Sequence, residues 1–368
     1  MRTYLDHNAT TPLRPEARTV MLAAMDEVGN PSSVHAEGRA AKAVIEKARG
    51  QVAALVGCTR GQVIFTSSAT EAAALAVAQK ARHGGRFAAL PTEHDCLRVW
   101  TDLDLPSLFD RNGCFDKAGF AALTDAPALL AVSAANSETG VMLPGGSVAA
   151  PVTPEQTIIC DITQIAGKVP IRFAETNPAY AILSAHKLGG PKGVGAFINF
   201  TSEDPEPILR GGGQEMNRRS GTENVIGIAG FGAAAEAAAG DVAAGRWEEI
   251  AELRNILENS LEAHEKKTIF VGKDSLRLPN TSCIIADGWK GETQVMQMDL
   301  AGFAISAGSA CSSGKVKAST VLRAMGFGES EASCAIRVSL GLETTRDDVL
   351  RFADAWLAKR DRHEQRAA

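Results

Sequence analysis

The chain has 368 residues, more than one hydrophobic core usually spans, so two domains are expected. Apolar residues make up 45% and charged residues 22%, a composition that predicts a globular protein rather than a disordered chain. The net charge of -5, without a sustained run of lysine and arginine, disfavours nucleic acid or an anionic membrane as the main partner. A small-molecule ligand is favoured instead.

Neither the first residues of the chain nor its cysteines indicate export. Residues 1–6 carry no apolar signal-peptide core, and later apolar stretches are interrupted by charge or glycine, so a cytoplasmic location is expected. The seven cysteines are irregularly spaced without a CxxC pair, which predicts reduced thiols and no metal site. Four of them lie in apolar or periodic segments and are expected to pack: Cys58, Cys160, Cys283 and Cys334.

Helical and strand-like patterns alternate through the first two-thirds of the chain, which predicts an α/β fold. Helices are expected at residues 39–56 and 71–82, and strands at 63–66, 128–133, 157–160, 180–183 and 194–200. These strands end in polar or glycine-rich residues, where ligands bind in such sheets. We therefore expect a large domain with a mainly parallel sheet flanked by helices.

The last third predicts a smaller α+β domain. A helical, alanine-rich stretch at 228–263, broken at Gly240 and Gly245, marks the change of domain. Strands are expected after it at 279–286, 302–306 and 335–339, and helices at 319–325 and 347–362. Residues 15–250 are assigned to the large domain, and residues 1–14 and 251–368 to the small one.

Lys187 is the strongest local indication of chemistry. It follows an apolar strand and precedes the glycine-rich turn 189–193. A lysine that acts as a Schiff-base nucleophile needs burial or a neighbouring charge to lower its pKa, and a strand end beneath a glycine loop offers both. The alternative is an ordinary surface lysine in a loop.

Three further positions suit a pyridine cofactor that carries a phosphate. Asp161 follows an apolar strand, and an anion there would keep a pyridine ring electron-poor. The segment 67–71, between a strand and a helix, offers hydroxyls and free N–H groups to a phosphate. His94 could stack on the ring and carry protons. The alternatives are a turn aspartate, a simple capping box from Ser68 to Glu71, and a structural histidine.

Two regions suit binding of a phosphate or a carboxylate. The loop 211–222 combines backbone freedom, cations and a hydroxyl, although a solvated basic turn would have the same composition. Arg337, in the strand expected at 335–339, suits a bidentate grip on an amino-acid carboxylate. A structural ion pair is the alternative for Arg337.

Cys311 lies among small residues at 306–314 that cannot pack a core, which predicts an accessible thiol. Lys315 and Lys317 could favour its thiolate, the nucleophilic form. The alternative is an exposed cysteine without a role.

The order of these motifs resembles the class V aminotransferase branch of fold-type I pyridoxal-phosphate (PLP) enzymes, specifically the NifS/IscS-like cysteine desulfurases. The resemblance runs from end to end and rests on residues 4–12, 29–35, 65–71, 93–94, 136–140, 161–164, 184–193, 211–222 and 306–313. Two positions depart from the family: Ser137 stands where an asparagine usually contacts the cofactor oxygen, and Ala185 where glycine is common.

The resemblance implies a role for each matched residue. Lys187 would bind pyridoxal 5'-phosphate covalently, with His94 stacked on the ring, Asp161 at the ring nitrogen, and Gln164, Asn136 and Ser137 near the phenolic oxygen. The phosphate would be held by Ala69, Thr70, Ser184 and His186, with Thr222 reaching the cofactor of a neighbouring subunit. Arg337 and Asn30 would bind the substrate.

The function implied is conversion of L-cysteine to L-alanine, with sulfur passed to Cys311 as a persulfide. It would serve iron–sulfur clusters, other sulfur-containing cofactors or thiolated tRNA, through a homodimer and an acceptor such as an iron–sulfur scaffold protein. The alternatives are a selenocysteine lyase, a class V aminotransferase, or a degenerate sulfur-trafficking or regulatory subunit without activity.

Overall fold

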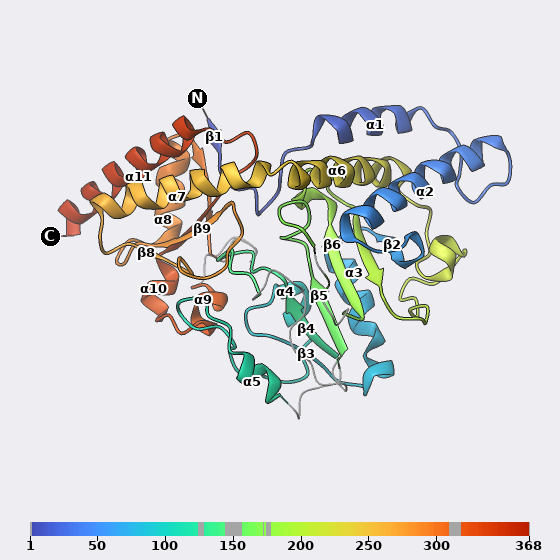
Figure 1. Ribbon diagram of the computed structural model, residues 1–368, viewed down its shortest axis with the longest axis horizontal. Helices are drawn as coiled ribbons and strands as arrows, with labels where there is room; N and C mark the ends of the chain where they lie inside the picture. The colour runs from blue at the N-terminus through green and yellow to red at the C-terminus, as the bar shows by residue number, and fades with distance from the viewer. Residues whose placement is uncertain are drawn as a thin grey trace.

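The computed structural model describes residues 2–123, 129–143, 157–171, 173, 178–308 and 318–367 (Figure 1). Its larger sheet has six strands in the order β2-β7-β6-β5-β4-β3. These strands are β2 (Val63–Thr66), β3 (Phe87–Ala89), β4 (Leu129–Ser133), β5 (Thr157–Asp161), β6 (Tyr180–Ser184) and β7 (Gly195–Asn199). Strands β3 to β6 are mutually parallel, whereas β7 is antiparallel to both β6 and β2. The expected mainly parallel sheet is confirmed.

Alternate side chains of the sheet enter two different cores. One face, with Phe65, Val132 and Leu183, packs against α1 (Pro15–Met25), α2 (Ala36–Val56) and α6 (Val225–Ala243). The other face, with Ile64 and Ile182, packs against α3 (Ala69–Ala78) and α4 (Asp95–Arg98). Helices therefore cover both faces, as a parallel sheet requires.

A second, antiparallel sheet has the order β11-β12-β9-β8. Its strands are β8 (Ile269–Phe270), β9 (Thr281–Ile285), β11 (Ser306–Ala307) and β12 (Ala335–Ser339), and a separate parallel pair joins β1 (Thr3–Tyr4) to β10 (Phe303–Ala304). The helices of this part are α7 (Arg246–His264), α8 (Gly291–Leu300), α9 (Thr320–Ala324), α10 (Glu329–Ser333) and α11 (Arg346–Ala367). Its main core gathers Leu5, Ile284, Trp289 and Trp356. The N-terminal strand thus packs with the last third of the chain.

The two helices of the expected pair, α6 and α7, run nearly end to end across the molecule (Figure 1). The break lies at Gly245, whose φ of 71° is left-handed, whereas Gly240 continues α6. Ile250 packs in the second core and α6 in the first. The two-domain division with its boundary at residue 250 stays a prediction.

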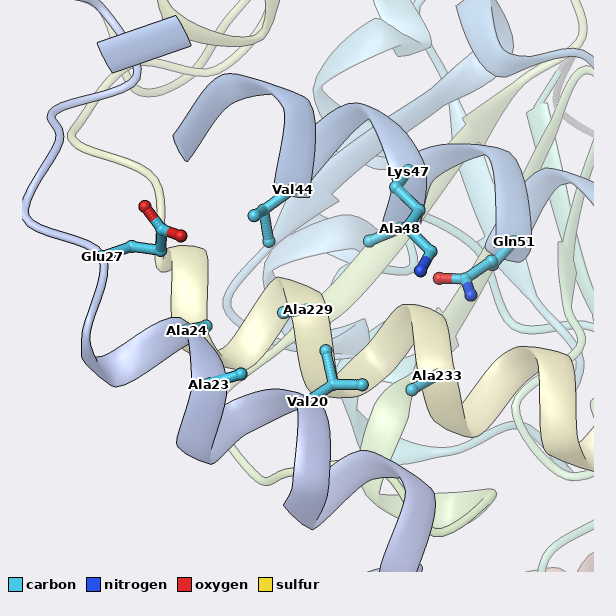
Figure 2. A pocket seen from close by; sticks show the side chains of 10 residues that line it. All are labelled: Val20, Ala23, Ala24, Glu27, Val44, Lys47, Ala48, Gln51, Ala229 and Ala233. Atoms are coloured by element: carbon cyan, nitrogen blue, oxygen red, sulfur yellow. The ribbon is translucent and has the colours of Figure 1, made fainter. Parts of the chain in front are cut away.

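Helix α6 is the only described helix long and apolar enough to cross a membrane by length and composition. It packs against α1 and α2, and most of its residues are buried. A cavity of about 160 Å³ remains between these three helices (Figure 2). Its lining is mainly apolar, from Val20, Val44, Ala48 and Ala229, with Lys47 and Glu27 at its edge.

Most expected elements are present within two residues of their predicted bounds, but several were missed. The helix expected at 71–82 is α3 followed by a 3₁₀ segment at Gln79–His83, and the strand expected at 302–306 is two short strands. The elements not predicted are β1, β8, α1, α4, α5 (Lys117–Ala121), α8 and α10. Many of these are too short to show a periodicity.

Candidate functional site

The site is built where several strands of the large sheet end. The strand register pairs Ser133 with Asp161 and Asp161 with Ile182, so β4, β5 and β6 end side by side. Across β7, Ser184 pairs with Gly195, which in turn pairs with Thr66 at the end of β2. The sheet therefore brings Asp161, Ser184 and the segment before α3 to one edge.

Lys187 ends a single 3₁₀ turn, Ala185–Lys187, that directly follows β6. Its Nζ donates to the backbone carbonyl oxygens of Asn8 and Ala9, each at 2.8 Å. Thr11 Oγ1 donates to the Lys187 carbonyl at 3.0 Å. The N-terminal segment thus holds the lysine at the strand end, where it was expected.

The N-terminus of α3 lies beside Ser184. Ser68 caps the helix by accepting the Glu71 N–H at 3.3 Å, while Ala69 and Thr70 are its first helical residues. Gly195 lets β7 lie close to the start of α3, because a Cβ at this position would lie 2.8 Å from the Ala69 nitrogen. The Glu71 carboxylate accepts the Ser67 N–H rather than that of Ser68, so the reciprocal capping box does not form.

His186, two residues after Ser184, is half-buried, with its Nδ1 3.1 Å from Thr10 Oγ1. Burial, then the neighbouring Lys187 and Lys192, lowers the pKa of His186 to about 4. The imidazole is therefore neutral at pH 7.

His94 caps α4 and exposes its ring, with Nδ1 accepting the Cys96 N–H at 3.1 Å. Glu93 beside it is buried, and its carboxylate contacts both the backbone N–H and the Oγ of Ser133. Burial, reinforced by Asp161, raises the pKa of Glu93 to about 8 against the effect of these hydrogen bonds. His94 and Asp161 therefore both lie near Glu93.

Asn136 and Ser137 form hydrogen bonds with other residues of the chain, and their contact with a cofactor stays a prediction. The Asn136 side chain donates to the Thr92 carbonyl at 2.9 Å and accepts the N–H groups of Glu138 and Thr139. The Ser137 carbonyl accepts from Arg337 at 3.0 Å and from Asn8 at 3.2 Å. Both residues shape the turn that follows β4.

Arg337 is buried on β12 and forms an ion pair with Asp6 at 2.7 Å. Its Nε is a buried donor without a hydrogen-bond partner among the described residues. Ser306, its register partner on β11, also donates to Asp6 at 2.7 Å. The site therefore holds a guanidinium with an unused donor beside the strand that leads to Gly308.

Two arginines of the loop 211–222 form hydrogen bonds with other residues of the chain. Arg219 grips Glu71 through two hydrogen bonds of 2.7 and 3.1 Å, and Arg218 donates to the carbonyls of Glu215 and Gly61. Thr222 is exposed and lines a cavity of about 100 Å³ with Ser67 and Gly193. Both arginines of this loop are therefore held by neighbouring residues, while a role of the loop in binding a phosphate stays a prediction.

One predicted residue, Asn30, lies away from this site within the chain. Asn30 is exposed in the segment between α1 and α2, at the opposite end of the molecule from the small sheet that carries Arg337 (Figure 1). Cys311 lies outside the described residues. The cysteines expected to pack do so: Cys160, Cys283 and Cys334 are buried, and Cys58 packs on the first core.

Three residues of the site carried no prediction. Lys168 is buried beside Gln164, Asn8 joins both lysines, and Glu138 accepts from Ser319 at 2.5 Å. Burial raises the pKa of Glu138 to about 7. A charged residue inside the apolar stretch 162–169 was the available signal for Lys168.

These features define an α/β protein with a candidate site where the strands of its large sheet end. The site contains Lys187 and the N-terminus of α3. A family model described as aminotransferase class-V matches residues 3–352. The chain therefore belongs to the class-V aminotransferase family, which confirms the resemblance and the fold class.

The curated relatives of this chain are cysteine desulfurases within this family. A cysteine desulfurase of Cereibacter sphaeroides is 38% identical over 96% of this chain and 94% of its own length. The cysteine desulfurase IscS of Dictyoglomus turgidum is 35% identical over 94% of this chain and 91% of its own. Among solved structures, a NifS-like protein from Rickettsia africae is 30% identical with a TM-score of 0.86, covering 98% of this chain and 100% of that one.

Proposed function

We propose that this chain is a PLP-dependent cysteine desulfurase that converts L-cysteine to L-alanine and receives the sulfur on Cys311 as a persulfide. The observation that carries the proposal is Lys187 at the strand end, beside Asp161, Gln164 and the start of α3. The end-to-end match to cysteine desulfurases supports it.

The residues present fit the cofactor. Free N–H groups at the start of α3, with Ser184 and a neutral His186, suit the phosphate. Asp161 suits the ring nitrogen, His94 the ring face, and Gln164 the phenolic oxygen. When bound, PLP would act as an electron sink for the carbanion formed at the substrate Cα.

The chain's own groups then divide the remaining work. Arg337 would bind the substrate carboxylate through its unused Nε, and Lys187 Nζ would take the proton from the substrate Cα. The Cys311 thiolate would attack the substrate sulfur. The S–S bond of the persulfide forms as the C–S bond of the substrate breaks, and the three-carbon product regains a proton at Cα, gains another at Cβ and leaves as alanine.

The wider setting follows from the same proposal. We expect a homodimer, in which Thr222 and Asn30 would serve the neighbouring subunit's site, and a cytoplasmic location. The acceptor would be a protein such as an iron–sulfur scaffold. A selenocysteine lyase or a class V aminotransferase would keep the cofactor residues without needing Cys311, and a degenerate subunit would not form a coloured complex with PLP.

Variants of Lys187 and Cys311 test the proposal. Lys187→Ala should lower alanine formation from cysteine by about 10²–10⁴-fold, because it removes the acid–base group. Cys311→Ser should bind PLP but form no protein persulfide, whereas the exposed-cysteine control Cys114→Ser should match the wild type. Alanine is measured by chromatography and the persulfide by mass spectrometry. A Cys311→Ser protein that releases sulfur at the wild-type rate would exclude the persulfide mechanism.

A further inference from the structure

Lys168 is a buried cation that the proposed reaction does not use. It lies in the turns that follow β5, four residues after Gln164, and only 3% of it is exposed. Its backbone N–H is fixed on the Ile165 carbonyl at 3.0 Å. In the part of the chain that the structure describes, no carboxylate forms an ion pair with it. Burying an unpaired ammonium is costly, so a role in the site would explain its retention.

The Lys168 ammonium contacts two side-chain amides. Its Nζ donates to Gln164 Oε1 at 2.9 Å and to Asn8 Oδ1 at 3.2 Å. Gln164 Nε2 in turn donates to the Asn8 carbonyl at 3.1 Å, and Lys187 Nζ donates to that same carbonyl at 2.8 Å. The two lysines are therefore linked through Gln164 and Asn8.

This arrangement fixes which way both amides point. In its protonated form Lys168 has only donors, so each amide then turns its oxygen toward Lys168 and its NH₂ group away. The Gln164 Nε2 then faces the carbonyl that holds Lys187, and Asn8 Nδ2 reaches Thr281 Oγ1 at 2.8 Å. Without Lys168, neither oxygen would have a charged donor to set its orientation.

Charge links the two lysines as well. Burial lowers the pKa of Lys168 to about 7, and the charges of Lys187 and Arg337 add to this effect. Lys168 in turn contributes to the lowered pKa of His7. Because a pairwise repulsion acts equally on both partners, Lys168 disfavours a positive charge at Lys187.

We propose that Lys168 is a positioning residue of the Lys187 site, which orients the Gln164 amide and disfavours a positive charge at Lys187. This inference rests on the proposed function, because the group that Gln164 would face is the cofactor held by Lys187.

The test compares Lys168→Met with the exposed-lysine control Lys267→Met, each as holoprotein and as cofactor-free protein. In the holoprotein, the pH midpoint of the visible cofactor band should move upward in Lys168→Met and not in the control. In the cofactor-free protein, Lys187 should react several-fold more slowly with an amine-reagent at neutral pH, measured by peptide mass spectrometry.

A double variant separates positioning from bulk structure. If Lys168 acts through Gln164, adding Lys168→Met to Gln164→Met should change the midpoint less than Lys168→Met does alone. Fully additive effects, or an unchanged midpoint in a folded Lys168→Met protein, would overturn the inference. Lys168→Gln replaces Lys168→Met if the latter does not fold, and failure of both to fold would assign Lys168 a structural role only. A wild-type protein that takes up no PLP would instead refute the proposed function.

Discussion

At the residue scale, the site contains two carboxyl groups, Glu93 and Glu138, whose burial favours the protonated form. Glu93 is 4% exposed, next to Asp161, and Glu138 accepts from Ser319 Oγ. Burial is the largest cause of the raised pKa of both carboxyls, which reach about 8 and about 7. Protonation of Glu93 removes one negative charge from this buried part of the site.

We predict a pH-dependent stability effect from Glu93. Its carboxyl titrates at 4.5 when unperturbed and at about 8 in the folded chain, so the folded protein binds a proton that the unfolded chain lacks between these values. The stabilisation from this proton is complete below pH 4.5 and is lost as the pH rises through 8. Glu93→Gln does not titrate. Between pH 6 and pH 9 its free energy of unfolding should therefore rise by about 1–3 kcal/mol relative to that of the wild type.

Urea unfolding at the two pH values measures this difference. The matched control is the exposed Glu252→Gln, whose stability should follow the wild type at both values. A constant offset between Glu93→Gln and the wild type would mean that Glu93 is ionised throughout.

At the element scale, the loop before α6 contains a left-handed turn of non-glycine residues. Glu215, Met216 and Asn217 have φ values of 49°, 58° and 65°. The turn is held by Glu215, whose buried carboxylate pairs with Arg49 at 2.7 and 2.8 Å. The ion pair offsets the backbone strain and fixes the loop that carries Arg219 and Thr222.

We predict that Met216→Gly stabilises the protein by roughly 0.5–1 kcal/mol, because glycine adopts a left-handed conformation without strain. Met216 is 57% exposed, so little packing is lost. The matched control is Met296→Gly in α8, which is 59% exposed and helical and should cost about 1 kcal/mol. Chemical denaturation of both variants gives the comparison, and equal destabilisation of the two would show that the turn is unstrained.

At the scale of the whole molecule, Asn8 connects the two cores. Its side chain reaches Thr281 and Asn280 in the small part, and Ser137 and Lys168 in the large part. Its carbonyl holds Lys187. The N-terminal segment therefore couples the arrangement of the two cores to the position of the lysine.

We predict that Asn8→Ala lowers the free energy of unfolding by roughly 2–4 kcal/mol, because several buried polar groups lose a partner. It should also weaken PLP binding, since Lys168 loses the Asn8 Oδ1 acceptor and the backbone carbonyl that holds Lys187 is then fixed less firmly. Calorimetry and cofactor titration measure the two effects, with the exposed Asn112→Ala as control. If the variant is less stable but binds PLP with unchanged affinity, Asn8 connects the two cores without supporting the Lys187 site.

Local patterns of the sequence determined most of the strands of the large sheet and the position of Lys187. Apolar runs predicted the strands that carry Asp161 and Ser184, and the glycine-rich turn singled out Lys187, because strand burial and turn geometry depend on neighbouring residues. Only the tertiary structure decided the contacts of Lys168, Asn8, Glu93 and Arg337. Their partners lie on other strands or far along the chain, such as Asp6 for Arg337 and Asn8 for Lys168. Such pairs form only when the sheet brings distant segments together, and no local periodicity encodes them.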